Sequence, residues 1–262
     1  MTFDIDNYSL LAIFAASLVL IAGAGETGHW LGVRAARQGA AAVSTLEGAI
    51  LGLLALMIGF TFSMALSRFE ARRDGVVTEA AAIGTTALRA RLLPAPHDRD
   101  SVKLLREYVQ IRLDLARGPI GRAEFDRAIA RSNLLQEALW RQAQAVAAKD
   151  NAMVPTGLFI QSLNEMIDDQ EKRLSAMSNR LPLIVIAALY GICAMGIGFA
   201  GYGSGLESKR ARLPVHITGL LVATMVLLIQ DLDRPGSGFI TVSQQPLVNT
   251  AATIDAFPAG RP

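Results

Sequence analysis

The chain has 262 residues, of which 52% are hydrophobic and 18% are charged, and its formal net charge is +2. The charged residues are segregated, because the segment 68–180 holds 18 of the 25 Lys and Arg and 15 of the 23 Asp and Glu. This segregation excludes an ordinary soluble domain, which would mix polar and apolar residues at a regular period, and the small net charge without a basic stripe excludes nucleic acid as a partner.

Four segments without a charged side chain are long enough to cross a bilayer. These apolar runs cover residues 7–25, 48–67, 181–206 and 213–230. A bilayer core about 30 Å thick needs roughly 20 helical residues. The polar part of the chain is too short to shield four such runs from water. We therefore predict an all-α integral membrane protein with four transmembrane helices and the lipid bilayer as its first partner.

Small residues within these runs predict close helix contacts. Gly48 and Gly52 lie four residues apart in the second run, and Gly191 and Gly198 lie in the third. Such residues let two helix backbones approach each other, which favours association in lipid. Glycine is also common in membrane helices for other reasons, and the sequence leaves both interpretations open.

The polar segment between the second and third runs is predicted to be a helical bundle outside the membrane. Breaks rich in Pro and Gly separate helices of about 68–93, 98–117, 121–148 and 157–180. No Gly or Pro interrupts residues 63–73 or 176–180, so we predict that the second and third membrane helices continue into the bundle. The predicted domains are residues 1–67 (transmembrane pair), 68–180 (helical domain), 181–231 (transmembrane pair) and 232–262 (tail).

Polar residues within the apolar runs are the candidates for a functional site, because such residues are costly in lipid and mark ion or substrate paths. Phe60, Thr61 and Ser63 in the second run, with Thr224 and Gln230 in the fourth, are candidates to line a pore. Phe60 is included because a large apolar side chain can form a constriction.

A charged motif follows the fourth run at the expected membrane interface. Asp231, Asp233 and Arg234 lie within four residues of each other. They could form a salt-bridged turn at the interface or a ring of charge at the mouth of a pore. The sequence is compatible with both.

Residues typical of catalysis are scattered. His29, His97 and His216 lie in three different regions, and Cys193 is the single cysteine. The sequence holds no pair of ligands at the spacing of a metal site and no Gly-rich phosphate loop. We therefore predict no enzyme activity, no metal and no cofactor.

Several motifs together resemble the bacterial bestrophin-like membrane family. The strongest are Asp-Leu-Asp-Arg-Pro at 231–235 and Val-Ser-Gln-Gln-Pro-Leu at 242–247, and the similar segments span about 45–250. Weaker similarity lies at residues 59–73, 79–94, 163–168 and 180–182. The resemblance implies four membrane helices and distant kinship with bestrophins, which are pentameric anion channels.

The resemblance also implies a function. Bestrophins narrow their pore with bulky apolar side chains one turn apart on the second membrane helix, and Leu54, Ile58 and Phe62 form such a row here. We expect a homo-oligomeric ion channel or pore, a pentamer by resemblance alone, with ions as the transported species. The alternative is a non-transporting scaffold or sensor whose helical domain binds a partner.

The cell inner (plasma) membrane is the expected location of this multi-pass chain. The short connections carry basic residues at Arg34, Arg37 and 209–212, which predicts that they face the cytoplasm and that both termini and the helical domain lie outside. Basic residues also flank the opposite ends of the spans, and the family resemblance implies a cytoplasmic helical domain. Of these two orientations, we predict the one given by the short connections, with both termini and the helical domain outside.

Overall fold

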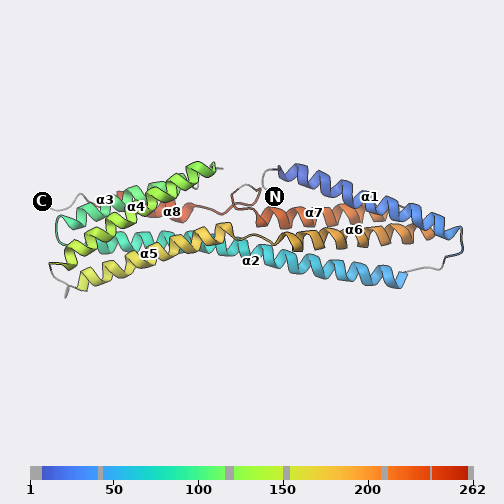
Figure 1. Ribbon diagram of the computed structural model, residues 1–262, viewed down its shortest axis with the longest axis horizontal. Coiled ribbons are helices and arrows are strands. Elements are labelled where there is room, and N and C mark those ends of the chain that lie inside the picture. The colour runs from blue at the N-terminus through green and yellow to red at the C-terminus, as the bar shows by residue number, and fades with distance from the viewer. Residues whose placement is uncertain are drawn as a thin grey trace. The chain divides into compact units, whose positions relative to one another are not determined.

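The computed structural model describes residues 8–40, 44–115, 121–149, 154–207, 212–236 and 238–258. Within these residues every regular element is a helix, and four helices are long and apolar enough to cross a membrane. This confirms the predicted fold class. The helices are α1 Leu10–Ala36, α2 Ser44–Ala90, α3 His97–Asp114, α4 Arg122–Ala147, α5 Val154–Ser178, α6 Leu183–Leu206, α7 Leu213–Asp233 and α8 Gln245–Asp255 (Figure 1).

The chain divides into two compact units. The membrane unit consists of Met1–Phe69, Arg180–Arg234 and Gly238–Ile240, and the helical unit of Glu70–Asn179, Pro235–Ser237 and Thr241–Pro262. Helix α2 contributes to both. The helical unit also includes α8, a short helix in the segment that the sequence analysis treated as a tail.

The membrane unit is organised around α1, α6 and α7, which pack against one another (Figure 1). Its core contains fully buried apolar side chains from α1, α6 and α7, among them Ile21, Ile197 and Ile229. Helix α2 adds Leu54 and Ala65 to the same core. Four spans thus share one apolar interior.

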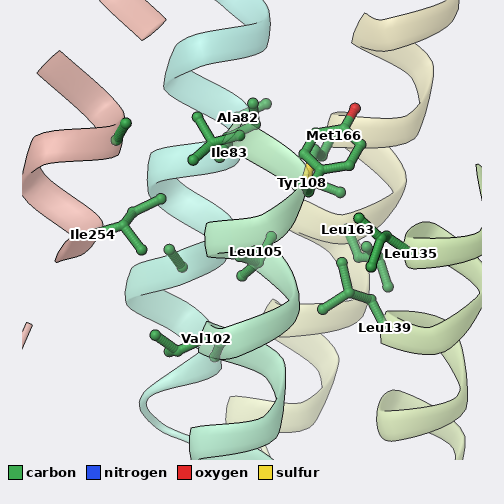
Figure 2. Packing of buried hydrophobic residues seen from close by; sticks show 14 of the residues in the cluster. Ala82, Ile83, Val102, Leu105, Tyr108, Leu135, Leu139, Leu163, Met166 and Ile254 are labelled. Atoms are coloured by element: carbon green, nitrogen blue, oxygen red, sulfur yellow. The ribbon is translucent and has the colours of Figure 1, made fainter. Parts of the chain in front are cut away.

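The helical unit has a separate core of larger size. Figure 2 shows Ile83 of α2, Leu105 of α3, Leu139 of α4, Leu163 of α5 and Ile254 of α8 converging on it. All five side chains are inaccessible to solvent. Burial of such side chains, each worth roughly 1.5–3 kcal/mol, holds the helices of this unit together.

The two predicted helix continuations have different outcomes. Helix α2 runs for 47 residues without a break, as residues 63–73 predicted. The second prediction is wrong, because α5 ends at Ser178 and α6 begins only at Leu183. Pro182 explains the break, since a proline disfavours helical backbone at the residue before it. The amide of that residue, Leu181, instead donates to the carboxylate of Asp233 at 3.0 Å.

Candidate functional site

The membrane part of α2 has one packed face and one exposed face. Leu54, Thr61 and Ala65 repeat at helical spacing and are at most 3% exposed. On the opposite side, Leu56 is 55% and Phe60 is 62% exposed. Among the four spans, α2 is the least covered by the rest of the chain. In its most hydrophobic stretch of 18 residues 17% are buried, against 22–33% in the same stretch of the other three spans. Its outer face is therefore available to lipid or to another copy of the chain.

The pore candidates on α2 fall on both faces. Phe60 and Ser63 lie on the exposed face. Thr61 points into the packed side, where its hydroxyl donates to the backbone oxygen of Met57 at 2.8 Å. A hydroxyl bonded within its own helix in this way has no free donor to offer an ion.

The row of bulky residues that the family resemblance suggested also lies on the packed side. Leu54 is buried, and Ile58 and Phe62 pack against the same core. A second row at the same spacing is exposed instead and consists of Leu56, Phe60 and Met64. The sequence alone could not distinguish the two rows, because both repeat every four residues.

The pore candidates on α7 do not share one face. Thr224 is exposed, and its hydroxyl donates to the backbone oxygen of Leu220 at 2.9 Å. Gln230 is buried, and its amide nitrogen donates to the hydroxyl of Tyr190 on α6 at 2.7 Å. Tyr190 in turn is 2.5 Å from the hydroxyl of Ser17 on α1. Gln230 therefore belongs to a hydrogen-bonded chain that joins three helices.

Asp231 organises the turn that follows α7. Its two carboxylate oxygens accept from the amides of Phe239 and Ile240 at 2.8 and 3.0 Å. A side chain at Gly238 would lie 2.2 Å from the same carboxylate, so any other residue there would displace the carboxylate from these amides. The carboxylate is 3% exposed and takes two charge-assisted hydrogen bonds, which indicates a structural role.

Asp233 and Arg234 form hydrogen bonds with two other segments of the membrane unit. Asp233 accepts from the amide of Leu181 just before α6, and the guanidinium of Arg234 donates to the backbone oxygen of Tyr8 at 3.0 Å. Both side chains are at most 7% exposed. These contacts are hydrogen bonds to backbone groups, and the choice between a salt-bridged turn at the interface and a ring of charge stays a prediction.

Glycines bring the backbones of α1 and α6 into direct contact. A side chain at Gly28 would lie 1.9 Å from the backbone oxygen of Gly198, and one at Gly201 would lie 2.2 Å from that of Gly25. The pattern continues at Gly32 and Gly205, where an added carbon would again meet backbone of the other helix. The contact glycines of α1, Gly25, Gly28 and Gly32, recur every three or four residues, and the sequence analysis did not identify this pattern.

The four glycines predicted to pack have different surroundings. Gly198 lies in the α1–α6 contact. Positions Gly48, Gly52 and Gly191 face open space, with no atom of the described residues within 4 Å of an added side chain. For these three glycines, a role in helix packing stays a prediction, and it would require a contact with a helix of another chain.

The helical unit buries a charged cluster that sequence reasoning did not find. Glu79 of α2 is inaccessible and pairs with Arg112 of α3 at 2.6 Å and with Arg173 of α5. Tyr108 donates its hydroxyl to Gln170 at 2.8 Å beside this carboxylate. Burial, and then the charge of Glu79, raise the pKa of Tyr108 above its ordinary value. These residues come from distant parts of the sequence, so no sequence motif indicates the cluster.

The histidines have different contacts, and two of them lie near the same pair of charged residues: Arg212 contacts both His29 and Glu26, and Glu26 contacts His216. His97 bonds Gln142 at 2.6 Å, and His216 lies 3.0 Å from Glu26. Within the described ranges, no group of three or more His, Cys, Asp or Glu side chains has an arrangement that could hold a metal ion.

The comparisons with known proteins agree on one family. The sequence profile of the bestrophin-like domain matches residues 11–247. The fold is similar to that of a bacterial bestrophin homolog from Klebsiella pneumoniae, with a TM-score of 0.66, 16% identity and coverage of 94% of this chain and 96% of that chain. A tryptophan-to-alanine variant of a Klebsiella pneumoniae bestrophin homolog gives a TM-score of 0.68 at 16% identity, with 95% and 96% coverage.

Among curated proteins, none matches this sequence. The family profile nevertheless covers most of the chain, and the similar structures match its fold over nearly their full length. The chain therefore belongs to the bestrophin-like domain family.

Proposed function

We propose that this chain forms a homo-oligomeric ion channel in the inner membrane, with the exposed face of α2 lining the pore. The observation that carries the proposal is the asymmetry of α2. One face packs into the membrane unit, and the other presents Leu56 and Phe60 more than half exposed. Family membership supports the same function, because bestrophins are anion channels.

The chemistry of this face suits a pore better than a surface covered by lipid alone. Leu56, Phe60 and Met64 form an apolar row, and the exposed hydroxyl residues Ser63 and Ser67 follow on the same side. Repeated around a symmetry axis, the apolar row makes a constriction that excludes water unless it widens. The serines then provide polar groups at the next turns of the helix.

A ring of chains also explains why α2 is left uncovered. A helix that lines a central pore contacts its symmetry mates and the aqueous path rather than helices of its own chain. Gly48 and Gly52, which face open space, would let a neighbouring backbone approach. We expect a closed ring, and a pentamer by kinship with bestrophins.

The first test is oligomeric state and ion flux of the purified protein. Native mass spectrometry in detergent measures the number of chains, and liposomes loaded with chloride, sodium or potassium measure flux. We expect a single closed oligomer and flux that requires the protein. A monomer without flux would refute the channel, and a ring without flux would favour the scaffold alternative.

The second test uses the constriction. Replacing Phe60 by Ala removes most of the apolar ring and should raise ion flux at least severalfold. Leu56→Ala should act in the same direction. Leu221→Ala on α7 is the matched control, because Leu221 is 62% exposed but lies on a different span. Equal effects of Leu56→Ala and Leu221→Ala would exclude α2 as the pore helix.

The orientation in the membrane stays a prediction with two opposing arguments. Basic residues in the short connections favour external termini, whereas kinship with bestrophins favours a cytoplasmic helical domain. A reporter fused after Pro258 decides between them, because alkaline phosphatase is active only outside the cytoplasm and a fluorescent protein only inside it.

A further inference from the structure

A polar pocket lies at one end of the membrane unit, between α1 and α6. It has a volume of about 460 Å³ and is lined by the polar residues His29, Arg37, Ser204 and Glu207 together with apolar neighbours. Both helices end here, so the pocket lies at the level where a bilayer changes from hydrocarbon to headgroups. Trp30 supports this level, because it is 62% exposed and aromatic rings of this kind sit at the interface.

The hydroxyl of Ser204 has an unusual environment. Other hydroxyls in the spans return their hydrogen bond to the backbone of their own helix, as in Ser17, Thr27, Thr61, Thr218 and Thr224. Ser204 is 3% exposed, yet its hydroxyl has no partner among the described residues. Ser204 is one of the residues that line the pocket, and a buried hydroxyl without a partner is unfavourable, so a ligand atom that this side chain can reach would satisfy it.

His29 supplies a second donor on the same wall. The Nε–H of Arg212 donates to its Nε2 atom at 3.1 Å, which places the ring proton on Nδ1. Nδ1 is buried and lacks a partner within the described part of the chain. His29 lines the pocket, and its imidazole has an N–H group without a partner among the described residues.

The surrounding charges favour an anion with a single negative charge. Arg37 is exposed at the pocket rim and adds a guanidinium to the two neutral donors. Glu207 on the same wall disfavours a dianion such as free hydrogen phosphate more than it disfavours a phosphate diester.

We propose that this pocket binds the phosphate group of a phospholipid headgroup. His29 Nδ1, the Ser204 hydroxyl and Arg37 would donate to the phosphate oxygens, while the acyl chains remain in the bilayer. The close contact of α1 and α6 shapes the pocket floor, because Gly205 lies directly on the backbone of His29 and Val33. This site does not depend on whether the chain conducts ions.

The test measures lipid binding to the delipidated protein by native mass spectrometry and thermal stability. The probes are dimyristoyl phosphatidylethanolamine, dimyristoyl phosphatidylglycerol, dimyristoylglycerol without phosphate, and inorganic phosphate. We expect saturable binding of the phospholipids and at least tenfold weaker binding of dimyristoylglycerol. Ser204→Ala and Arg37→Gln should each weaken phospholipid binding about tenfold, as expected for hydrogen bonds to a charged group.

Thr27→Val on α1 is the matched control, because its hydroxyl bonds within the helix and binding should not change. Arg37 is exposed, so its replacement leaves the fold intact and keeps the test valid if Ser204→Ala disturbs packing. Equal binding of dimyristoylglycerol and phospholipid, or no effect of Arg37→Gln, would overturn the proposal. Binding of inorganic phosphate as tight as that of phospholipid would preserve a phosphate site but reject a lipid as its source.

Discussion

The membrane unit and the helical unit both bury large apolar side chains, but in the membrane unit glycines also bring two helix backbones into direct contact. Between α1 and α6 the contact positions are glycines such as Gly28 and Gly201, while large side chains such as Phe60 point outward. In the helical unit large side chains fill the interior (Figure 2). The same unit buries the charged cluster around Glu79.

The difference follows from the solvent of each unit. In lipid, burying a leucine gains little, because lipid tails are as apolar as the side chain, and close backbone approach provides the attraction. In water, burial of large apolar side chains is the main favourable contribution. The comparison implies that the two units respond to different substitutions, and the predictions below test this in order of expected effect.

The largest effect is expected in the helical unit from Glu79→Ala. The change leaves the guanidinium groups of Arg112 and Arg173 buried without their shared carboxylate, which typically costs about 3–5 kcal/mol. Thermal unfolding by circular dichroism and limited proteolysis of residues 70–179 measure the loss.

The control is Glu107→Ala. Glu107 pairs with Arg131 on the surface, where the side chains are 42% and 62% exposed. Such a pair contributes at most about 1 kcal/mol. Equal destabilisation by both variants would show that the buried cluster contributes no more to the free energy of unfolding than the surface pair does.

In the membrane unit, Gly28→Ala should come next. The added methyl group meets the backbone oxygen of Gly198, so α1 and α6 must separate, at a cost of roughly 3 kcal/mol. Gly191→Ala on α6 faces open space within the chain and should leave monomer stability unchanged. The midpoint of thermal aggregation in detergent measures both, and a stable Gly28→Ala protein would contradict the observed helix contact.

A smaller effect is expected from Asp231→Ala. The amides of Phe239 and Ile240 lose their acceptor, which costs about 1–3 kcal/mol. Ion selectivity in a bilayer should not change if the motif is a structural turn. A shifted reversal potential with unchanged stability would instead support a ring of charge.

The smallest effect at neutral pH is expected from Tyr108→Phe, about 1 kcal/mol for one hydrogen bond. The folded state raises the pKa of Tyr108 above that of the unfolded chain. The neutral side chain of Tyr108 therefore contributes fully to stability below about pH 10, and this contribution is lost as the pH rises further. Ultraviolet titration should show that Tyr108 resists ionisation until the helical unit unfolds. In Tyr108→Phe this late step should be missing.

Sequence reasoning succeeded where the pattern is local. Runs of uncharged residues identified the four spans, and the absence of Gly and Pro over 63–73 predicted the unbroken α2. It failed at Pro182, where the restriction on the preceding residue outweighed helical periodicity. It also missed α8, because an 11-residue helix in a polar tail has too short a pattern to recognise.

For the candidate site, too, the sequence predicted only what a local pattern can show. The sequence identified Phe60 as a bulky residue and Gln230 as a polar residue within the spans. It could not show which face of each helix is covered by other helices. It grouped Thr61 with Ser63, although one is buried and the other exposed. The cluster of Glu79 with Arg112 and Arg173 joins three helices, and only tertiary structure brings such residues together.

The position of α8 has a consequence for biosynthesis. Ile254 fills the core of the helical unit, and Arg106 donates to its backbone oxygen at 3.0 Å. The ribosome makes this segment after α6 and α7, so most of the unit is synthesised well before the piece that completes it. Maturation of the bundle therefore waits until the last span has left the ribosome, and a chain that stops early carries an unfinished core that proteases can recognise.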